Sequence, residues 1–218
     1  MCIRDRDYKI DFVVTNGENA ADGYGILPSI CEELFSAGVD VITSGNHIWD
    51  KSEIIPYIAR SNRLLRPLNY PEQSPGSGSS IYNDKRGRKI LVINIMCQLF
   101  MEPLDNPFII IEKELNKHNL GENVSAIIVD VHGEASSEKI ALANHLDGKV
   151  SIVIGTHTHV PTSDLQILPF GTTYQTDAGM CGDYDSVIGG DKILWMERFR
   201  RKMPVGRIYS SQGEASLC

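Results

Sequence analysis

The feature that most constrains the fold of this chain is the alternation of short, β-branched apolar runs with amphipathic stretches. The runs Lys89–Met96, Ser125–Val131 and Val150–Gly155 have the length and composition of buried strands. A helix is predicted directly after the second of them, at Ser136–Leu146. Nearly continuous apolar strands that alternate with helices are typical of a layered α/β fold.

The remaining predicted elements keep this alternation along the chain. We expect further strands at Asp11–Thr15, Val39–Thr43 and Val205–Ser210, and a hairpin made of Leu165–Ile167 and Thr172–Gln175. Further helices are predicted at Pro28–Ala37, Ser52–Arg60, Ile109–Lys117 and Asp191–Arg200. The Pro-, Gly- and Ser-rich stretch Tyr70–Ser80 is predicted to be a surface loop. Because no repeat or linker divides the sequence, residues 1–218 are predicted to form a single domain.

Composition argues against several classes of protein. The apolar runs are strand-length, too short for the roughly 18–20 residues that a membrane span needs. A net charge of −7 disfavours a polymeric nucleic acid as the partner. The five cysteines form no CxxC pair, so neither a disulfide framework nor a zinc–thiolate site is expected. No apolar signal-peptide core begins the chain, and we therefore expect a cytoplasmic protein.

Four short polar segments each follow a predicted strand. They are Asn16–Asn19, Gly45–His47, Asp130–Glu134 and Gly155–His159. Each one alone has an ordinary explanation, such as a turn, a helix cap or a hydrogen-bonded core histidine. Ligands of α/β sheets gather at the carboxyl ends of the strands, so the four segments are expected to converge on one site.

The residue types in these segments suit a metal centre. The candidate ligands are the carboxylate of Glu18, the amide oxygens of Asn19 and Asn46, and the imidazoles of His132, His157 and His159. Residues two apart in an extended chain point to the same side, so His157 and His159 are expected to face one cluster. Mixed oxygen and nitrogen ligands favour manganese or iron, with zinc also compatible. Two metals about 3.5–4 Å apart would activate water and clamp a phosphate.

Longer strings make the resemblance to one family specific. They are NGENAADGYGI, SGNHIWD, RPLNYPE, VDVHGEASSEK, GTHTHVPTSD and TDAGM. From about Tyr8 to Arg207 the chain resembles the YmdB-type branch of the calcineurin-like metallophosphoesterases, a bacterial-type family. The resemblance implies a layered metallophosphoesterase fold, in which a β-sheet sandwich is flanked by helices. It also implies a di-metal phosphodiesterase that acts on small, cyclic nucleotide-type substrates.

The resemblance further implies a role for each candidate residue. Glu18 matches the ligand that bridges the two metals, and His47 matches the general acid that protonates the leaving oxygen. The other matches are Asn19 and His159 for the first metal, and Asn46, His132 and His157 for the second. Asp130 and Glu134 are candidate carboxylates for orienting a ligand histidine, although a salt bridge to Lys139 is an equal alternative for Glu134.

The chain departs from the family pattern at its ends. The family begins with a strand ending in Gly-Asp, whose Asp binds the first metal, and no such segment is recognisable here. We therefore expect a fold without its first strand, truncated at both ends, with residues 1–6 non-native. The first metal site would lack its usual Asp, so the second site is expected to bind more tightly.

Two other functions remain alternatives at this point. One is a regulatory or scaffold protein with a structural metal site and little turnover, and the other is a metal-dependent ester or amide hydrolase. Arg60, Arg63 and Arg66, and separately Arg198–Lys202, are candidates for phosphate contacts, with solvated surface as the alternative. The expected partner is a small phosphodiester, not a membrane, and the sequence leaves open a homo-oligomer.

Overall fold

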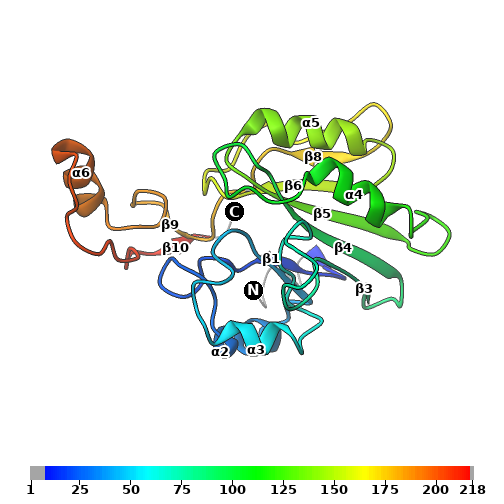
Figure 1. Cartoon of the computed structure of the whole chain (residues 1–218), viewed down its shortest axis with the longest axis horizontal. Coiled ribbons are helices and arrows are strands. Elements are labelled where there is room, and N and C mark those ends of the chain that lie inside the picture. The colour runs from blue at the N-terminus through cyan, green and yellow to red at the C-terminus, as the bar shows by residue number, and fades with distance from the viewer. Residues whose placement is uncertain (1–7, 217–218) are drawn as a thin grey trace.

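The computed structural model describes residues 8–216 and arranges them in layers (Figure 1). The largest layer is a six-stranded sheet in the order β3-β4-β5-β6-β8-β7. Its strands are β3 (Ser79–Asn83), β4 (Lys89–Met96), β5 (Ala126–His132), β6 (Ile152–Thr156), β7 (Gln166–Ile167) and β8 (Thr173–Gln175). The expectation about residues 1–6 lies outside the described residues.

A second, smaller sheet lies against one face of the first. It consists of β1 (Val14–Asn16) and β2 (Val41–Thr43), which pair in parallel. Helices α2 (Pro28–Ser36) and α3 (Ile54–Ile58) pack on the small sheet. Helices α4 (Pro107–Leu115) and α5 (Ser136–Leu146) cover the opposite face of the large sheet. The predicted sandwich of sheets flanked by helices is therefore confirmed.

Strand β4 shows how the sequence builds these layers. Its alternate residues Ile90 and Val92 pack between the two sheets with residues of the small sheet. The intervening residues Leu91, Ile93 and Ile95 face the other way and pack in the core under α4 and α5. A strand that is buried on both faces needs this continuous apolar run, because successive side chains point to opposite faces.

The strand directions gather the polar segments at one edge. Strands β4, β5, β6 and β8 are mutually parallel, whereas β3 and β7 pair antiparallel at the two margins. His132 at the end of β5 lies opposite Thr156 at the end of β6. In the small sheet, Asn16 ends β1 opposite Thr43 at the end of β2. Each of these strand ends leads into one of the polar segments singled out above.

Most predicted elements form, with shifted boundaries, but two predictions are wrong. Val205–Ser210 is not a strand, because only Ser210 makes an isolated bridge, to Gly190. The predicted loop Tyr70–Ser80 ends in the first residues of β3, an edge strand with mostly polar, partly exposed residues. An edge strand is buried on fewer sides and carries a weaker apolar signal. The short strands β9 (Gly182–Asp183) and β10 (Ala215–Ser216) were also not predicted.

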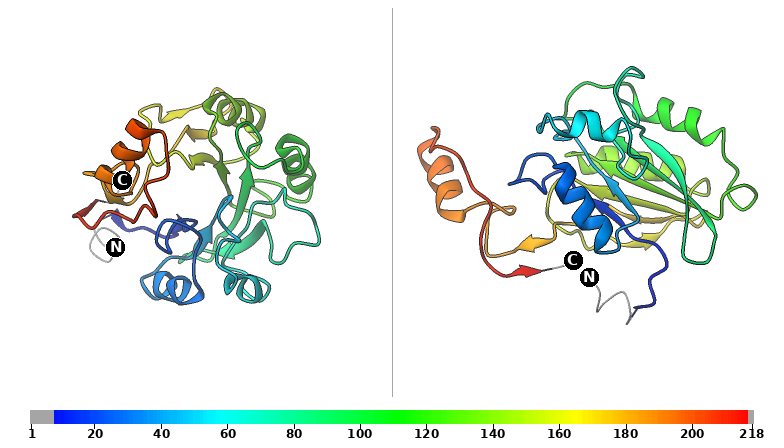
Figure 2. Two further views of the ribbon diagram at one scale, coloured as in Figure 1. Left: turned by 60° about the vertical axis from the view of Figure 1, so that its left-hand side comes forward. Right: turned by 90° about the horizontal axis from the view of Figure 1, so that it is seen from below.

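Residues 182–216 form an arm that stands off the layered body. It contains β9, β10 and helix α6 (Lys192–Arg201), and Figures 1 and 2 show it extending from the edge of the sheets. No residue of α6 is buried, although the helix was predicted from its sequence at nearly the same bounds. Among residues 8–216, no helix is both long enough and apolar enough to cross a bilayer.

Candidate metal centre

Four of the six candidate ligands meet around the imidazole of His132. Its Nε2 lies 2.5 Å from Oε2 of Glu18, 3.0 Å from Oδ1 of Asn46 and 3.1 Å from Nδ1 of His157. Ligand atoms of Glu18, His132 and His157 all lie within 4.8 Å of one another, and the first two residues are buried. Four segments far apart in the sequence therefore supply one cluster, as predicted from their positions after strands.

The remaining two candidate ligands form a neighbouring pair. Nε2 of His159 lies 3.1 Å from Oδ1 of Asn19. Both residues are close in sequence to members of the first cluster. Asn19 directly follows Glu18, and His159 lies two residues after His157. The structure thus brings the six candidates together as a cluster of four and an adjacent pair.

The hydrogen bonds of the three histidines show which ring nitrogens face the site. Thr156 Oγ1 donates to Asp130 and lies 2.9 Å from Nδ1 of His132, so this Nδ1–H must be the donor. His159 donates from Nδ1 to the Ile188 carbonyl at 2.8 Å. A ring that carries a single proton on Nδ1 has its lone pair on Nε2, and this atom faces the neighbouring candidate ligands.

His157 follows the same pattern with a different nitrogen. Its Nε2 lies 3.3 Å from a carboxylate oxygen of Glu134, which leaves the Nδ1 lone pair to face His132. Glu134 therefore contacts the ring of a candidate ligand histidine, and in the described part of the chain it makes no ion pair with Lys139. Lys139 pairs with Asp177 instead, at 2.8 Å.

This convergence of acceptor atoms fits a bound cation. Lone pairs of His132 and His157 face the Glu18 carboxylate and the Asn46 oxygen, and Oε2 of Glu18 is buried without a hydrogen bond of ordinary geometry. Buried ring nitrogens and oxygens that converge in this way form a set of donors that a divalent cation would satisfy. A Cβ atom at Gly45 would overlap Glu18 Oε2 and His132 Nε2, so glycine keeps this space free of side chain.

Electrostatics favours the ligand forms of these groups. Burial alone would raise the pKa of Glu18, but the adjacent histidines, chiefly His132, outweigh it and hold the pKa below its ordinary value. Burial, with repulsion from His132, lowers the pKa of His157 to about 4. Near neutral pH the site therefore holds a carboxylate and a neutral imidazole, the forms that bind metals.

A buried polar network supports His132 from behind. Asp130 is 2% exposed and accepts hydrogen bonds from Thr156 at 2.7 Å, Thr43 at 2.5 Å and Asn16 at 3.1 Å. Burial raises the pKa of Asp130, although these hydrogen bonds favour its ionised form. Thr156 contacts both Asp130 and His132 and so connects the buried carboxylate to the imidazole.

The loop that carries His157 and His159 is held in a strained conformation. Both residues have positive φ angles, 107° and 65°, which residues with a Cβ rarely adopt. Asp177 accepts a hydrogen bond from the backbone N–H of Thr158 between them at 3.0 Å. The buried ammonium of Lys139 bonds Asp177 and the carbonyl of Thr156, both at 2.8 Å. This ion pair fixes the ligand loop against helix α5.

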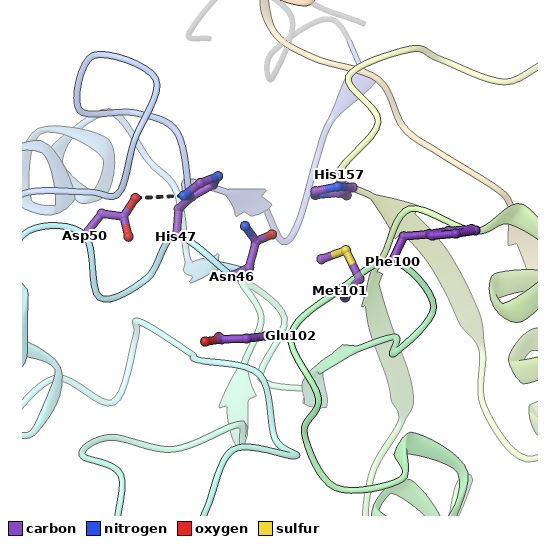
Figure 3. A pocket seen from close by; sticks show the side chains of 7 residues that line it. All are labelled: Asn46, His47, Asp50, Phe100, Met101, Glu102 and His157. Carbon is purple, nitrogen blue, oxygen red and sulfur yellow. Dashed lines mark hydrogen bonds and ion pairs between the residues drawn. The ribbon is translucent and has the colours of Figure 1, made fainter.

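His47, the candidate general acid, lines the pocket next to Asn46. Its Nδ1 lies 2.7 Å from a carboxylate oxygen of Asp50, and its side chain is 28% exposed (Figure 3). The ring edge of Tyr24 packs against it, with ring centroids 5.3 Å apart. With Nδ1 bound to Asp50, Nε2 is free to exchange a proton with a ligand in the pocket.

A pocket of about 370 Å³ opens beside His47. One part of its wall comes from the metal-ligand segments and the loop after β2, and another from the loop after β4. The lining residues are Asn46, His47, Asp50, Phe100, Met101, Glu102 and His157 (Figure 3). Sequence reasoning assigned no role to Asp50 and did not single out the three residues after β4, because they carry no ligand or acid–base pattern.

Two arginines considered for phosphate contacts have structural roles. Arg63 donates to the carbonyls of Val39 and Asp40, and its guanidinium lies 3.9 Å from the ring centroid of Phe35. Arg66 is 6% exposed and donates to the Pro67 carbonyl. Both guanidiniums are used to hold loops of this chain.

Comparison with known proteins identifies the family of this chain. The sequence model of the YmdB-like protein family matches residues 3–218. The chain belongs to the YmdB-like family. The predicted membership is thereby confirmed. A Bacillus subtilis relative named 2',3'-cyclic-nucleotide 2'-phosphodiesterase is 43% identical over 210 residues, which cover 96% of this chain and 78% of the relative. A Mycoplasma genitalium relative, provisionally named a phosphatase/phosphodiesterase, is 36% identical over 85% of this chain and 67% of its own length.

Two solved structures share the fold of this chain. A Thermus thermophilus protein of unassigned function is 43% identical and superimposes with a TM-score of 0.90, over 97% of this chain and 81% of its own. A structure described as a novel phosphatase from Mycoplasma pneumoniae is 32% identical, with a TM-score of 0.88 over 98% of this chain and 76% of its own. These names agree with the predicted enzyme class, a hydrolase that acts on phosphoester bonds.

Proposed function

We propose that this YmdB-like chain is a metal-dependent phosphodiesterase that hydrolyses small phosphodiesters of the cyclic-nucleotide type. One observation carries the proposal: the converging lone pairs of Glu18, Asn46, His132 and His157 lie next to the exposed imidazole of His47 in one pocket. The name of the Bacillus subtilis relative supports the substrate class.

The residues present fit two divalent cations. Glu18, Asn46, His132 and His157 would hold one, and Asn19 with His159, adjoining Glu18, would hold the other. When bound, such cations activate water for attack on phosphorus and neutralise charge on the phosphoryl oxygens. The oxygen and nitrogen donors favour manganese or iron, with zinc as a compatible third metal.

The chain's own residues supply the rest of the reaction. Asn46 and His157 line the pocket where a phosphodiester enters, and His47 lies beside them (Figure 3). Asp50 holds Nδ1 of His47, so that Nε2 delivers the proton to the departing sugar oxygen. A scaffold with a merely structural metal has no need of an oriented, exposed imidazole at this position, which favours an enzyme over that alternative.

Metal analysis and a substrate panel test the proposal together. We expect about two manganese or iron ions per chain by plasma mass spectrometry. We expect turnover of 2',3'-cyclic AMP that chelation abolishes and manganese restores. His47→Ala should keep the metal and lower turnover by about 10²–10⁴-fold.

Turnover of amide or carboxyl ester substrates alone would favour the other hydrolase class, and full metal without any turnover would favour the scaffold. The second site is expected to fill first in a titration.

A further inference from the structure

The segment between β4 and α4 presents an apolar tip on the side of the pocket opposite the proposed general acid (Figure 3). Leu99 is 51% exposed and Phe100 is 89% exposed. Phe100 and Met101 line the same pocket as His47 (Figure 3). Nothing in the proposed chemistry of phosphate hydrolysis uses these two side chains.

The base of this segment is firmly held. The Glu138 carboxylate of α5 accepts hydrogen bonds from the backbone N–H groups of Gln98 and Leu99, both at 2.9 Å. The Gln98 side chain donates to the Leu104 carbonyl at 2.6 Å and thereby closes the loop. Asn69 donates to the carbonyl of Asp105 at 2.9 Å from the other side. The position of the tip is therefore built into the fold.

The backbone conformation and the exposure of Phe100 are both unfavourable for the folded protein. Its φ angle is 63°, a left-handed conformation that is unfavourable for a bulky side chain. Its exposed ring gains little from burial, and within residues 8–216 it has no aromatic partner. A strained, exposed aromatic on a rigid loop at a pocket is better explained by a ligand than by folding.

The pocket is divided by chemistry. Asn46, His47 and His157 offer polar groups suited to the phosphate, whereas Phe100 and Met101 offer an apolar surface. A nucleotide has the same division, because a charged phosphate and a flat aromatic base are joined through the sugar. Aromatic side chains bind bases by stacking, without preference for sequence.

We infer that Phe100, supported by Met101, stacks on the base of a nucleotide substrate and so determines specificity for nucleoside cyclic phosphates over other phosphodiesters. The inference rests on the proposed function and names the residue that selects the substrate. Phe100 is a specificity-determining residue in this scheme and takes no part in the proton transfer.

Kinetics on two matched substrates test this inference. One is 2',3'-cyclic AMP, and the other is methyl riboside 2',3'-cyclic phosphate, which carries the same phosphate ring and no base. Phe100→Ala should raise the KM for cyclic AMP about tenfold, with kcat changed less than about twofold and the base-free KM unchanged. Phe100→Tyr keeps an aromatic ring at this position and should have the wild-type KM for cyclic AMP. Phe170→Ala, at an 81% exposed phenylalanine outside the pocket lining, is the matched control.

A binding measurement separates this inference from the proposed function. By titration calorimetry, wild-type protein should bind adenosine 3'-monophosphate about tenfold more tightly than ribose 3-phosphate, and Phe100→Ala should bind both equally. Equal binding of both ligands by the wild type would overturn the inference, as would equal KM changes for both substrates. A changed oligomeric state in Phe100→Ala with unchanged KM would show that the tip contacts protein. If the wild type showed no turnover but still preferred adenosine 3'-monophosphate tenfold, the proposed phosphodiesterase function would be overturned. The inference that Phe100 stacks on the base would stand.

Discussion

Nδ1 of His47 lies 2.7 Å from a carboxylate oxygen of Asp50, one turn further along the same segment. The contact fixes which ring nitrogen faces the pocket. Replacing Asp50 by Asn removes the negative charge that holds the imidazole, so the proton-donating geometry is populated less. We expect Asp50→Asn to lower kcat about 10–100-fold, while metal content stays unchanged.

A neighbouring variant separates this effect from a general loss of charge. Glu53→Gln removes an exposed carboxylate three residues later that contacts Ser52 and not His47. It should leave kcat within about twofold of wild type. The role assigned to Asp50 would be contradicted by parallel losses of kcat in both variants, or by loss of metal in Asp50→Asn.

Thr156 offers a test of the network behind the metal ligands. Its hydroxyl contacts Nδ1 of His132 and donates to Asp130. In Thr156→Val the imidazole loses the partner that sets its tautomer, and we expect about 10–100-fold weaker metal binding. Thr43→Val removes a hydrogen bond to the same carboxylate without touching His132. In urea denaturation, both variants should lose a similar unfolding free energy of about 1–3 kcal/mol. Only Thr156→Val should also show the weaker metal binding.

The candidate ligand set could be proposed from the sequence because each candidate lies just after a predicted strand. Buried parallel strands need continuous apolar runs, and their ends must lie at one edge, so residues such as Glu18 and His132 could be placed together without coordinates. The same logic marks Asp130 as a candidate carboxylate, but it does not reach Thr156 or show how the two residues are connected. Their importance depends on which buried donor meets which acceptor across two strands, and that pairing requires the register.

The pocket wall after β4 was missed for a different reason. Phe100 carries no ligand or acid–base chemistry, and an aromatic in an apolar context is ordinarily assigned to the core. Only its exposure and its positive φ angle mark it as unusual. Likewise β3 has too few apolar residues to be recognised, because an edge strand pairs on one side only.

Gly45 tests whether the empty space between the ligands is used. A Cβ atom there would overlap Glu18 Oε2 and His132 Nε2, so these side chains must separate in Gly45→Ala. We expect the variant to lose at least half of the bound metal, measured by plasma mass spectrometry on protein shown to be folded by circular dichroism. Gly182→Ala, where an added Cβ meets nothing within 4 Å, should keep the wild-type content. Full metal in Gly45→Ala would show that cations bind elsewhere.

The ion pair of Lys139 with Asp177 tests how the strained histidine loop is held. Both side chains are fully buried and 2.8 Å apart. Lys139→Met leaves a buried carboxylate without its cation, which costs about 3–5 kcal/mol of unfolding free energy. The same change frees the Thr156 carbonyl and loosens the segment that carries His157, so metal affinity should fall together with stability.

Two comparison variants make this last prediction specific. In the double variant Lys139→Met with Asp177→Asn no buried charge is left, so urea denaturation should show that part of the lost stability returns. Lys192→Met breaks an exposed ion pair with Asp185 in the arm, where solvent screens the charges, and should cost far less stability than Lys139→Met. If Lys139→Met were no more destabilising than Lys192→Met, the buried pair would not be what holds the ligand loop, and its positive φ angles would need another support.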